Sequence, residues 1–422
     1  MTTNVKQNWL FGVLEPKQEL PKSLKILAVF LALLIINNVF SLSPNLPSMV
    51  QYLAIISVNG LIILLVGTGS FRVCLPMWLF WGMMWLSIVM NIGEIPAYFK
   101  SSQRTLFFLL TLLIAGPWFL NELLAKIRQC MFDVLNLSLL IMAVLSFLGK
   151  MLHFLPSDKQ GFYLGCTYHS MNLGALAGIA VVYSMHRMVQ SWQNVKLTRL
   201  FAGFCLASLL TVFLSCSRTC VISSLIAMLI YFCAGEHQKI RRVIKPVIVV
   251  SVLTYFTAQM LPAYFEGLLK KSSNREAGIT VDSLTYSRMS KWTSRIEEIK
   301  QSPIFGVGAH TVRLDDNAMN GQIEPGNAWL YIFSSMGIFA FVLFGYMVFE
   351  AIMQCRPKAK PGQKECLVVA LLVFFSLYMM GEAHVTSAGE FTCFYFWLLL
   401  GIAIDSGTKQ PLTTSEAIHA QS

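Results

Sequence analysis

The sequence predicts an all-α fold: a polytopic integral membrane protein of about twelve transmembrane helices, with one long periplasmic loop that contains helices. Hydrophobic residues make up 55% of the 422 residues and charged residues only 13%, whereas a soluble domain carries roughly a quarter charged residues. Apolar runs of about twenty residues recur, and each can cross a hydrocarbon core about 30 Å thick. One polar interval, residues 262–326, is far longer than the others. A soluble protein is excluded because too little polar surface exists to cover it.

The first apolar run, residues 24–42, follows a polar leader that contains Lys6, Lys17 and Lys22. It is longer than the apolar core of a signal peptide, so we expect an uncleaved first helix. The other predicted spans are 49–69, 74–92, 105–121, 134–152, 167–186, 200–215, 219–234, 243–261, 328–352, 366–381 and 391–405. The expected organisation is therefore nine spans in 1–261, a periplasmic loop in 262–326, three spans in 327–405 and a cytoplasmic tail in 406–422.

Lysine and arginine gather in alternate short loops, and such residues mark the cytoplasmic side of a membrane protein. A cytoplasmic N-terminus places on that side Arg72, Lys126, Arg128, Arg187, Lys196, Arg199, Lys239, Arg241, Arg242, Lys245, Arg356, Lys358, Lys360 and Lys364. The opposite short loops hold Lys100, Arg104, Lys150, Lys159 and Arg218. Both termini are thus predicted to be cytoplasmic, and the loop 262–326 faces outward.

The net charge of +11 is explained by these loops, so we expect no nucleic-acid partner. The ten cysteines are scattered, mostly within apolar runs, and form no Cys-x-x-Cys pair. Neither a zinc site nor a disulfide framework is therefore indicated.

Arg218 is the first candidate for chemistry, because it lies in a tight outward-facing junction between two spans. Lipid diphosphates present their charge at this level of the membrane, and the planar guanidinium fork donates two parallel hydrogen bonds to phosphate. The alternative is an interfacial arginine that only reaches the lipid headgroups.

The long loop contains a predicted amphipathic helix over residues 283–301. Arg288 and Arg295 are seven residues apart, so they share a face two turns apart. Two interpretations are open from the residues alone: this face lies against the bilayer and binds a diphosphate, or it is a solvated basic face. The apolar residues also share a face: Met289, Trp292, Ile296 and Ile299.

The chain after Pro303 contains a Gly-x-Gly turn, Gly306 to Gly308, which permits exposed backbone amides. His310 and Glu324 are candidate bases in this region. Asn327 begins the next span, where it either caps the helix or binds a sugar or phosphate.

Other polar residues lie at the outer ends of further spans. His169 precedes one such span and is a candidate for substrate binding. Glu382, His384 and Glu390 occur in the last outer loop. The simpler interpretation of each is a solvated loop residue.

These motifs follow one another in a characteristic order. Arg218 lies in a short outer loop, and two spans later the long loop carries a Tyr-Ser-Arg-x-x-x-Trp segment that contains Arg288. Pro-x-x-Gly-x-Gly follows, and Asn-x-x-Leu-Tyr then opens a span at Asn327, with Gly337 ten residues further on. The arrangement over residues 165–345 resembles the bacterial O-antigen ligase and polymerase superfamily.

The resemblance implies an inverting, metal-independent glycosyltransferase of the GT-C type that uses no cofactor. Such enzymes move a glycan from undecaprenyl diphosphate to an acceptor sugar on the periplasmic face of the bacterial inner membrane. The acceptor is the lipid A core in a ligase and a lipid-linked repeat unit in a polymerase. By motif, Arg218 and Arg288 would bind and neutralise the diphosphate leaving group, with Arg295 in a weaker role.

At Gly326 the sequence departs from the ligases, which usually carry histidine before the asparagine that opens this span. That histidine is thought to assist the acceptor hydroxyl. Either another residue supplies the base, with His310 and Glu324 the nearest in sequence, or the reaction needs little help from a base. The departure favours a polymerase over a ligase, because polymerases vary more at this position.

The rival class is a multipass transporter or flippase of a polysaccharide precursor. Transporters usually place ionisable residues near the bilayer midplane and often contain internal repeats. Here the predicted spans hold almost no charges and the polar residues gather on one side, which favours an enzyme. A structural assembly component is a third possibility, against which only the arginine positions argue.

Overall fold

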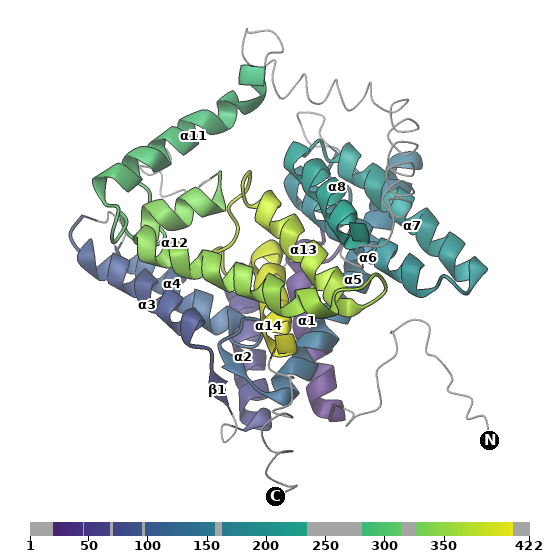
Figure 1. Ribbon diagram of the computed structural model, residues 1–422, viewed down its shortest axis with the longest axis horizontal. Helices are drawn as coiled ribbons and strands as arrows, with labels where there is room; N and C mark the ends of the chain where they lie inside the picture. Colours follow the sequence, from purple (N-terminus) through teal and green to yellow (C-terminus); the bar gives the residue numbers. More distant parts are fainter. Residues whose placement is uncertain are drawn as a thin grey trace, which may run out of the picture.

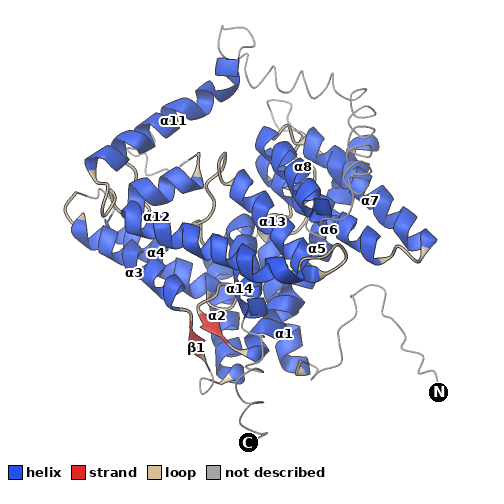
Figure 2. Ribbon diagram, in the orientation of Figure 1, coloured by secondary structure: helices blue, strands red, loops and turns tan. Residues whose placement is uncertain are grey.

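The computed structural model describes residues 20–44, 46–67, 71–94, 98–156, 163–233, 281–313 and 326–407. Within these ranges the protein is a bundle of α-helices, shown in Figure 2. A short antiparallel pair, β1 (Arg72–Val73) and β2 (Phe119–Leu120), joins two of the connections. The predicted helical class is confirmed.

Figure 1 labels the helices in chain order. Their bounds are α1 Lys22–Asn37, α2 Ser48–Val66, α3 Leu75–Met90, α4 Tyr98–Leu112, α5 Glu122–Met151, α6 Ser170–Gln190, α7 Val195–Leu214, α8 Arg218–Cys233, α11 Val281–Gln301, α12 Ala328–Cys355, α13 Lys364–Tyr378 and α14 Phe391–Gly407. A 3-10 turn, Arg356–Lys358, follows α12.

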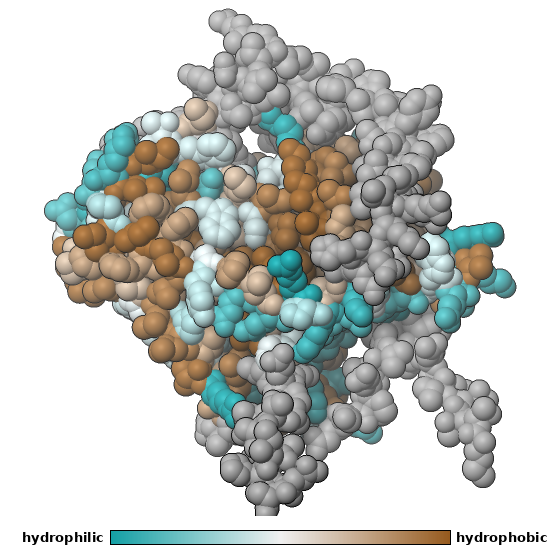
Figure 3. Space-filling view, viewed as in Figure 1, coloured by the Kyte–Doolittle hydropathy of each residue, from teal (hydrophilic) through white to brown (hydrophobic). Residues whose placement is uncertain are grey.

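Each predicted span overlaps one of these helices, apart from 243–261, which lies outside the described residues. Four helices of the described part are long and apolar enough to cross a membrane: Ser48–Val66, Glu122–Met151, Val195–Leu214 and Ala328–Lys358. Large apolar side chains are also exposed, and they cover much of the face in Figure 3. The chain is thus a helical membrane protein, while the count of twelve crossings and their orientation stay predictions.

The helix α14 forms the centre of the bundle. All its residues from Phe391 to Asp405 are buried, and it packs against α5, α12 and α13. A helix that is apolar all round lies inside its protein. Phe344 of α12 accordingly contacts Phe396 with a tilted ring and Trp397 edge-on. Because α14 runs through the core, it links the two ends of the bundle.

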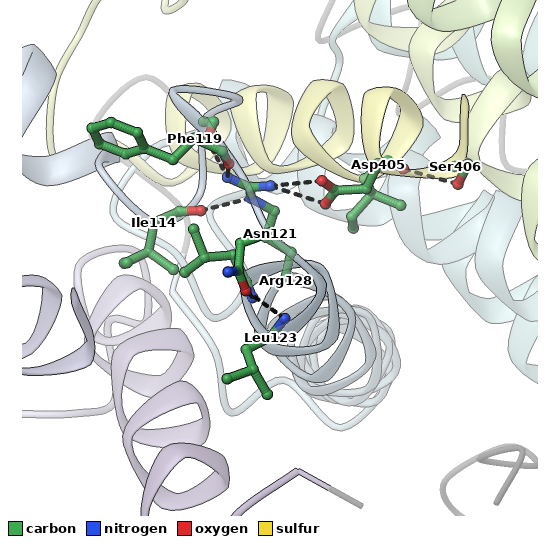
Figure 4. Close-up of polar contacts among 10 residues, drawn as sticks. Ile114, Phe119, Asn121, Leu123, Arg128, Asp405 and Ser406 are labelled. Atoms are coloured by element: carbon green, nitrogen blue, oxygen red, sulfur yellow. Dashed lines mark hydrogen bonds and ion pairs between the residues drawn. The ribbon is translucent and has the colours of Figure 1, made fainter. Parts of the chain in front are cut away.

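At the end where α14 stops, Arg128 of α5 is fully buried (Figure 4). Its Nε donates to the carbonyl of Ile114, and its Nη2 donates to those of Gly116 and Phe119, each at 2.8 Å. Its Nη1 lies 2.9 Å from both carboxylate oxygens of Asp405. One guanidinium therefore satisfies three carbonyls of an irregular segment, and Asp405 neutralises its charge.

Two sequence expectations are wrong here. The predicted span 105–121 ends early, since α4 stops at Leu112. The next helix begins at Glu122, because Asn121 Oδ1 caps it by accepting from the backbone N–H of Leu123 at 2.7 Å. Arg128 therefore lies inside α5 and not in the cytoplasmic loop to which its charge assigned it.

The helix α12 is broken at Gly337, whose φ is 81°. The freed carbonyls of Ser334 and Ser335 accept from the amides of Val307 and Gly308 at 2.8 and 3.1 Å. A Cβ at Gly337 would lie only 1.9 Å from the carbonyl oxygen of the Ile304 backbone, so no other residue fits. The amides of Val307 and Gly308 are thus bonded to α12 and that of Gly306 donates to the carbonyl of Ser302, so the amides of the Gly-x-Gly turn are not exposed as the sequence suggested.

Candidate active site

Three helices begin at one end of the bundle, which we call the polar end: α8, α12 and α14. The backbone N–H of Ala328, at the start of α12, donates to the carbonyl of Met379 at 2.8 Å. A Cβ at Gly381, in the segment before α14, would lie 2.4 Å from Oγ1 of Thr219 in α8. The amino-terminal end of a helix attracts negative charge, so the polar end is suited to anionic groups.

Arg295 of α11 is buried beside this end. Its Nη1 lies 2.9 Å from Oε2 of Glu298, and its Cζ lies 5.3 Å from the centre of the Tyr331 ring. Its Nη2 is buried and has no hydrogen-bond partner among the described residues. A buried donor without an acceptor is costly, so this nitrogen is a candidate contact for a ligand oxygen.

A network of hydrogen bonds holds this arginine in place. Oε1 of Glu298 accepts from the backbone N–H of Arg313 at 2.7 Å. Nη2 of Arg313 donates to Oδ1 of Asn91, and Nδ2 of Asn91 donates to the carbonyl of Gly306, at 2.9 and 3.0 Å. The network connects α11 to α3 and to the turn that closes the break in α12.

His310 contacts the same tyrosine, since its backbone is hydrogen-bonded to the Tyr331 hydroxyl. The backbone of His310 is in the left-handed conformation, with a φ of 59°, and its side chain is buried. Its Nε2 has no hydrogen-bond partner in the described part of the chain. Burial and the nearby positive charge of Arg104 lower the pKa of His310 to about 3, so the ring is neutral at pH 7.

Arg104 of α4 supplies an exposed positive charge close to this group. Its field acts on His310, on Tyr331 and on Tyr52 of α2. No hydrogen bond or ion pair occupies its guanidinium among the residues that the structure describes. Two arginines, a histidine and a tyrosine from four segments thus meet in one place.

Residues 203–345 match the family model of the O-antigen ligase. The resemblance to that family is confirmed. The match includes α8, α11 and the first part of α12, and hence Arg295, His310 and Tyr331. It indicates glycosyl transfer of the ligase or polymerase type, with lipid-linked glycans as substrates. A search of curated proteins found no match.

The two arginines that the O-antigen ligase motifs select occupy different elements. Arg218 is the first residue of α8 and is partly buried at the polar end. Arg288 lies in α11, but its side chain is outside the described part of the structure, as is the whole of Glu324. Their roles stay predictions.

Of the three candidate substrate-binding residues, Arg295, Asn327 and His169, the last two cap helices. Oδ1 of Asn327 accepts from the backbone N–H of Leu330 at 3.1 Å, at the start of α12. Nδ1 of His169 accepts from the backbone N–H of Met171 at 3.2 Å, at the start of α6. The start of α6 also belongs to the polar end, because a Cβ at Gly174 would lie 2.8 Å from Oγ of Ser215.

The predicted orientation of α11 is wrong. The sequence assigns Arg295 to an outward basic face, but this side chain is 1% exposed. Met289 and Ile296 are instead 50% and 44% exposed. The reversal follows from the partners of the arginine, because Glu298 and Tyr331 offer it an ion pair and an aromatic face inside the protein.

The role of Arg104 was missed from the sequence, whereas Glu382, His384 and Glu390 of the segment before α14 were named as polar residues of the last outer loop. Arg104 was counted only as an outer-loop charge, and its place in α4 beside His310 depends on tertiary packing. Two signals were nevertheless visible: an arginine on the outer side, and an Arg-x-x-Glu spacing at Arg295. Among the described residues, no cluster of three His, Cys, Asp or Glu side chains has the geometry of a metal site.

Proposed function

We propose that the protein is a membrane glycosyltransferase that moves a glycan from undecaprenyl diphosphate to an acceptor sugar. The polar end faces the periplasm of the bacterial inner membrane, and the acceptor is the lipid A core or another lipid-linked glycan. The observation that carries the proposal lies within residues 203–345, which match the O-antigen ligase model. In this region Arg218 and Arg295 lie near helix starts at the same end of the bundle. Helix starts and guanidinium groups are both suited to stabilise a diphosphate leaving group.

The positive groups act on the donor. When the bond between the sugar and the phosphate breaks, negative charge develops on the diphosphate, and preplaced guanidinium groups stabilise it. Arg218 and Arg288 are assigned to this contact, and Nη2 of Arg295 adds a buried donor. The start of α8 contributes its positive end to the same charge.

The remaining residues act on the sugars. Oδ1 of Asn327 is engaged in the helix cap, so its Nδ2 is proposed to contact a sugar or phosphate oxygen. Nδ1 of His169 is engaged in the cap of α6, so its Nε2 is the atom proposed to contact the substrate. His310 and Glu324 are the candidate bases nearest to the departure at Gly326.

The reaction is a displacement with inversion at the anomeric carbon. The acceptor oxygen forms the new bond to that carbon as the bond to the diphosphate oxygen breaks. The electron pair of the broken bond stays on undecaprenyl diphosphate, and the hydroxyl proton passes to a base or to solvent. No metal ion or cofactor is assigned to the reaction.

The test is glycan transfer by the purified protein in detergent, from an undecaprenyl-diphosphate glycan, with and without chelator. Arg218→Lys keeps the charge but loses the bidentate hydrogen bonds to phosphate. We therefore expect the rate of transfer to fall about tenfold to a hundredfold while the variant folds normally. Arg288→Ala should reduce the rate of transfer further. Arg187→Lys, the same change at the other end of α6, is the matched control and should retain the parent rate.

Two outcomes would overturn the proposal. Parent-rate transfer by folded Arg218→Lys and Arg288→Ala would remove the diphosphate contact and favour the transporter alternative. A cytoplasmic signal from a reporter fused near Lys270 would place the polar end on the wrong side; fusions after Arg242 and Arg356 should read as cytoplasmic. In a deletion strain, accumulated polymer with free core indicates a ligase, and core with one repeat unit indicates a polymerase.

A further inference from the structure

The segment between α13 and α14 contains a histidine held between two carboxylates. Nδ1 of His384 lies 2.7 Å from Oε2 of Glu390, and its Nε2 lies 3.9 Å from Oε2 of Glu382. The ring stacks on Tyr378 at a centroid distance of 6.4 Å. The side chains of His384 and Glu390 are 26% and 28% exposed, although the Nε2 atom of His384 is itself buried.

This segment is fixed from several directions. The hydroxyl of Tyr52 donates to the carbonyl of Ala388 at 2.7 Å, and Nδ2 of Asn38 donates to that of Gly389. From α14, Nε1 of Trp397 donates to the carbonyl of Val385 at 2.8 Å. A base acts efficiently only when its position is fixed, and these contacts supply that condition.

The same segment lies in the middle of the polar end. Gly381 packs against Thr219, the neighbour of Arg218, with no room for a side chain. Thr386 is hydrogen-bonded to the hydroxyl of Tyr331, whose ring lies beside Arg295. The segment that contains His384 therefore contacts the neighbours of Arg218 and of Arg295.

Gly326 offers no side chain that could act as a base. Its φ is 65°, a left-handed conformation that glycine adopts without strain. Its carbonyl accepts from Nε1 of Trp292 in α11 at 3.4 Å, which ties this conformation to the position of that helix. The chain thus uses glycine where the ligases usually carry histidine.

We propose that His384 is the general base of the transfer and that Glu390 is its positioning residue. The inference rests on the proposed function. Glu390 accepts from Nδ1–H, which leaves the lone pair of the ring on Nε2. As the acceptor oxygen attacks the anomeric carbon, Nε2 takes the hydroxyl proton and the electron pair of the broken bond leaves with the diphosphate. The imidazolium then returns its proton to solvent.

His310 is less suited to this task. Its ring is buried and its pKa is lowered to about 3, so it binds a proton weakly at neutral pH. His384 is partly exposed and faces two carboxylates, which stabilise the imidazolium that proton transfer creates.

His384→Asn is the decisive variant, because the amide nitrogen of asparagine replaces Nδ1 and keeps the contact with Glu390. We expect transfer to fall about a hundredfold, the usual cost of losing a general base, while binding of undecaprenyl diphosphate is unchanged. In this variant the rate of transfer should no longer decrease at acidic pH, so the acidic limb of the pH–rate profile should disappear. In His384→Ala, added imidazole should restore part of the rate. His153→Asn, on an exposed residue in a left-handed conformation that asparagine tolerates, is the matched control.

Glu390→Gln tests the positioning role. It should reduce the rate less than His384→Asn and move the acidic limb to lower pH, because the imidazolium loses a neighbouring anion. An unchanged profile would remove Glu390 from the mechanism.

The outcomes separate this inference from the proposed function. If the parent protein transfers glycan and folded His384→Asn does so at the parent rate, His384 is not the base, although the function stands. Loss of diphosphate binding in that variant would also contradict the inference. If the parent neither binds the diphosphate nor transfers glycan, the proposed function itself fails.

Discussion

Arg128 and Arg295 are both buried arginines paired with a carboxylate, yet their surroundings differ. All three guanidinium nitrogens of Arg128 are engaged, by three backbone carbonyls and by Asp405. Arg295 is paired with Glu298 through Nη1, while its Nη2 has no partner among the described residues. Burial alone therefore does not tell a structural arginine from a functional one.

The difference follows from what each arginine has to satisfy. Arg128 lies beside an irregular segment, residues 113–121, whose carbonyls would otherwise remain unpaired in an apolar interior. The comparable break in α12 is satisfied by backbone amides from the turn at Gly306, so it makes no demand on Arg295. That side chain can therefore serve a ligand.

The largest expected effect is on the structural arginine. Arg128→Met leaves Asp405 as an unpaired buried charge and frees three carbonyls, a change that typically costs about 3–5 kcal/mol. We expect little folded protein, measured as the monodisperse fraction in size-exclusion chromatography and as the melting temperature in detergent. Asp405→Asn should cost less, since the carbonyls keep their donors. A melting temperature of Arg128→Met equal to that of the parent would contradict this assignment.

A smaller effect is expected from acid, and it arises at the polar end. The folded protein lowers the pKa of His310 to about 3, whereas an unfolded histidine titrates near 6.5. Between these values the unfolded chain binds more protons, so stability is complete above about pH 6.5 and decreases as the pH falls toward about 3. His310→Gln should flatten this part of a plot of melting temperature against pH. An equal slope in parent and variant would show that His310 is not the group responsible.

The elements that depend on apolar length were predictable from the sequence. Each described span follows from a run of apolar residues, because a membrane helix needs little else. The start of α5 was also within reach, since asparagine followed by glutamate is a helix-cap signal at Asn121. Arg218 at a helix start was predicted by its position between two runs.

The pairings could not be predicted, because they join residues distant in sequence. Arg128 and Asp405 are 277 residues apart, and Tyr331 meets Arg295 only because α11 packs on α12. Periodicity assigned Arg295 to an outward face because a charged residue usually lies in solvent. A buried acceptor, Glu298, overrides that tendency.

Arg295 is thus expected to serve the reaction, whereas Arg128 serves the fold. The most direct test is the rate of glycan transfer per folded molecule for Arg295→Lys and Arg128→Lys, purified in parallel. We expect Arg295→Lys to melt within a few degrees of the parent but to transfer glycan about a hundredfold more slowly. Arg128→Lys should yield little folded protein, whose rate per molecule is that of the parent. Parent-rate transfer by Arg295→Lys, or an equal loss of rate per folded molecule in both variants, would show that Arg295 does not serve the reaction.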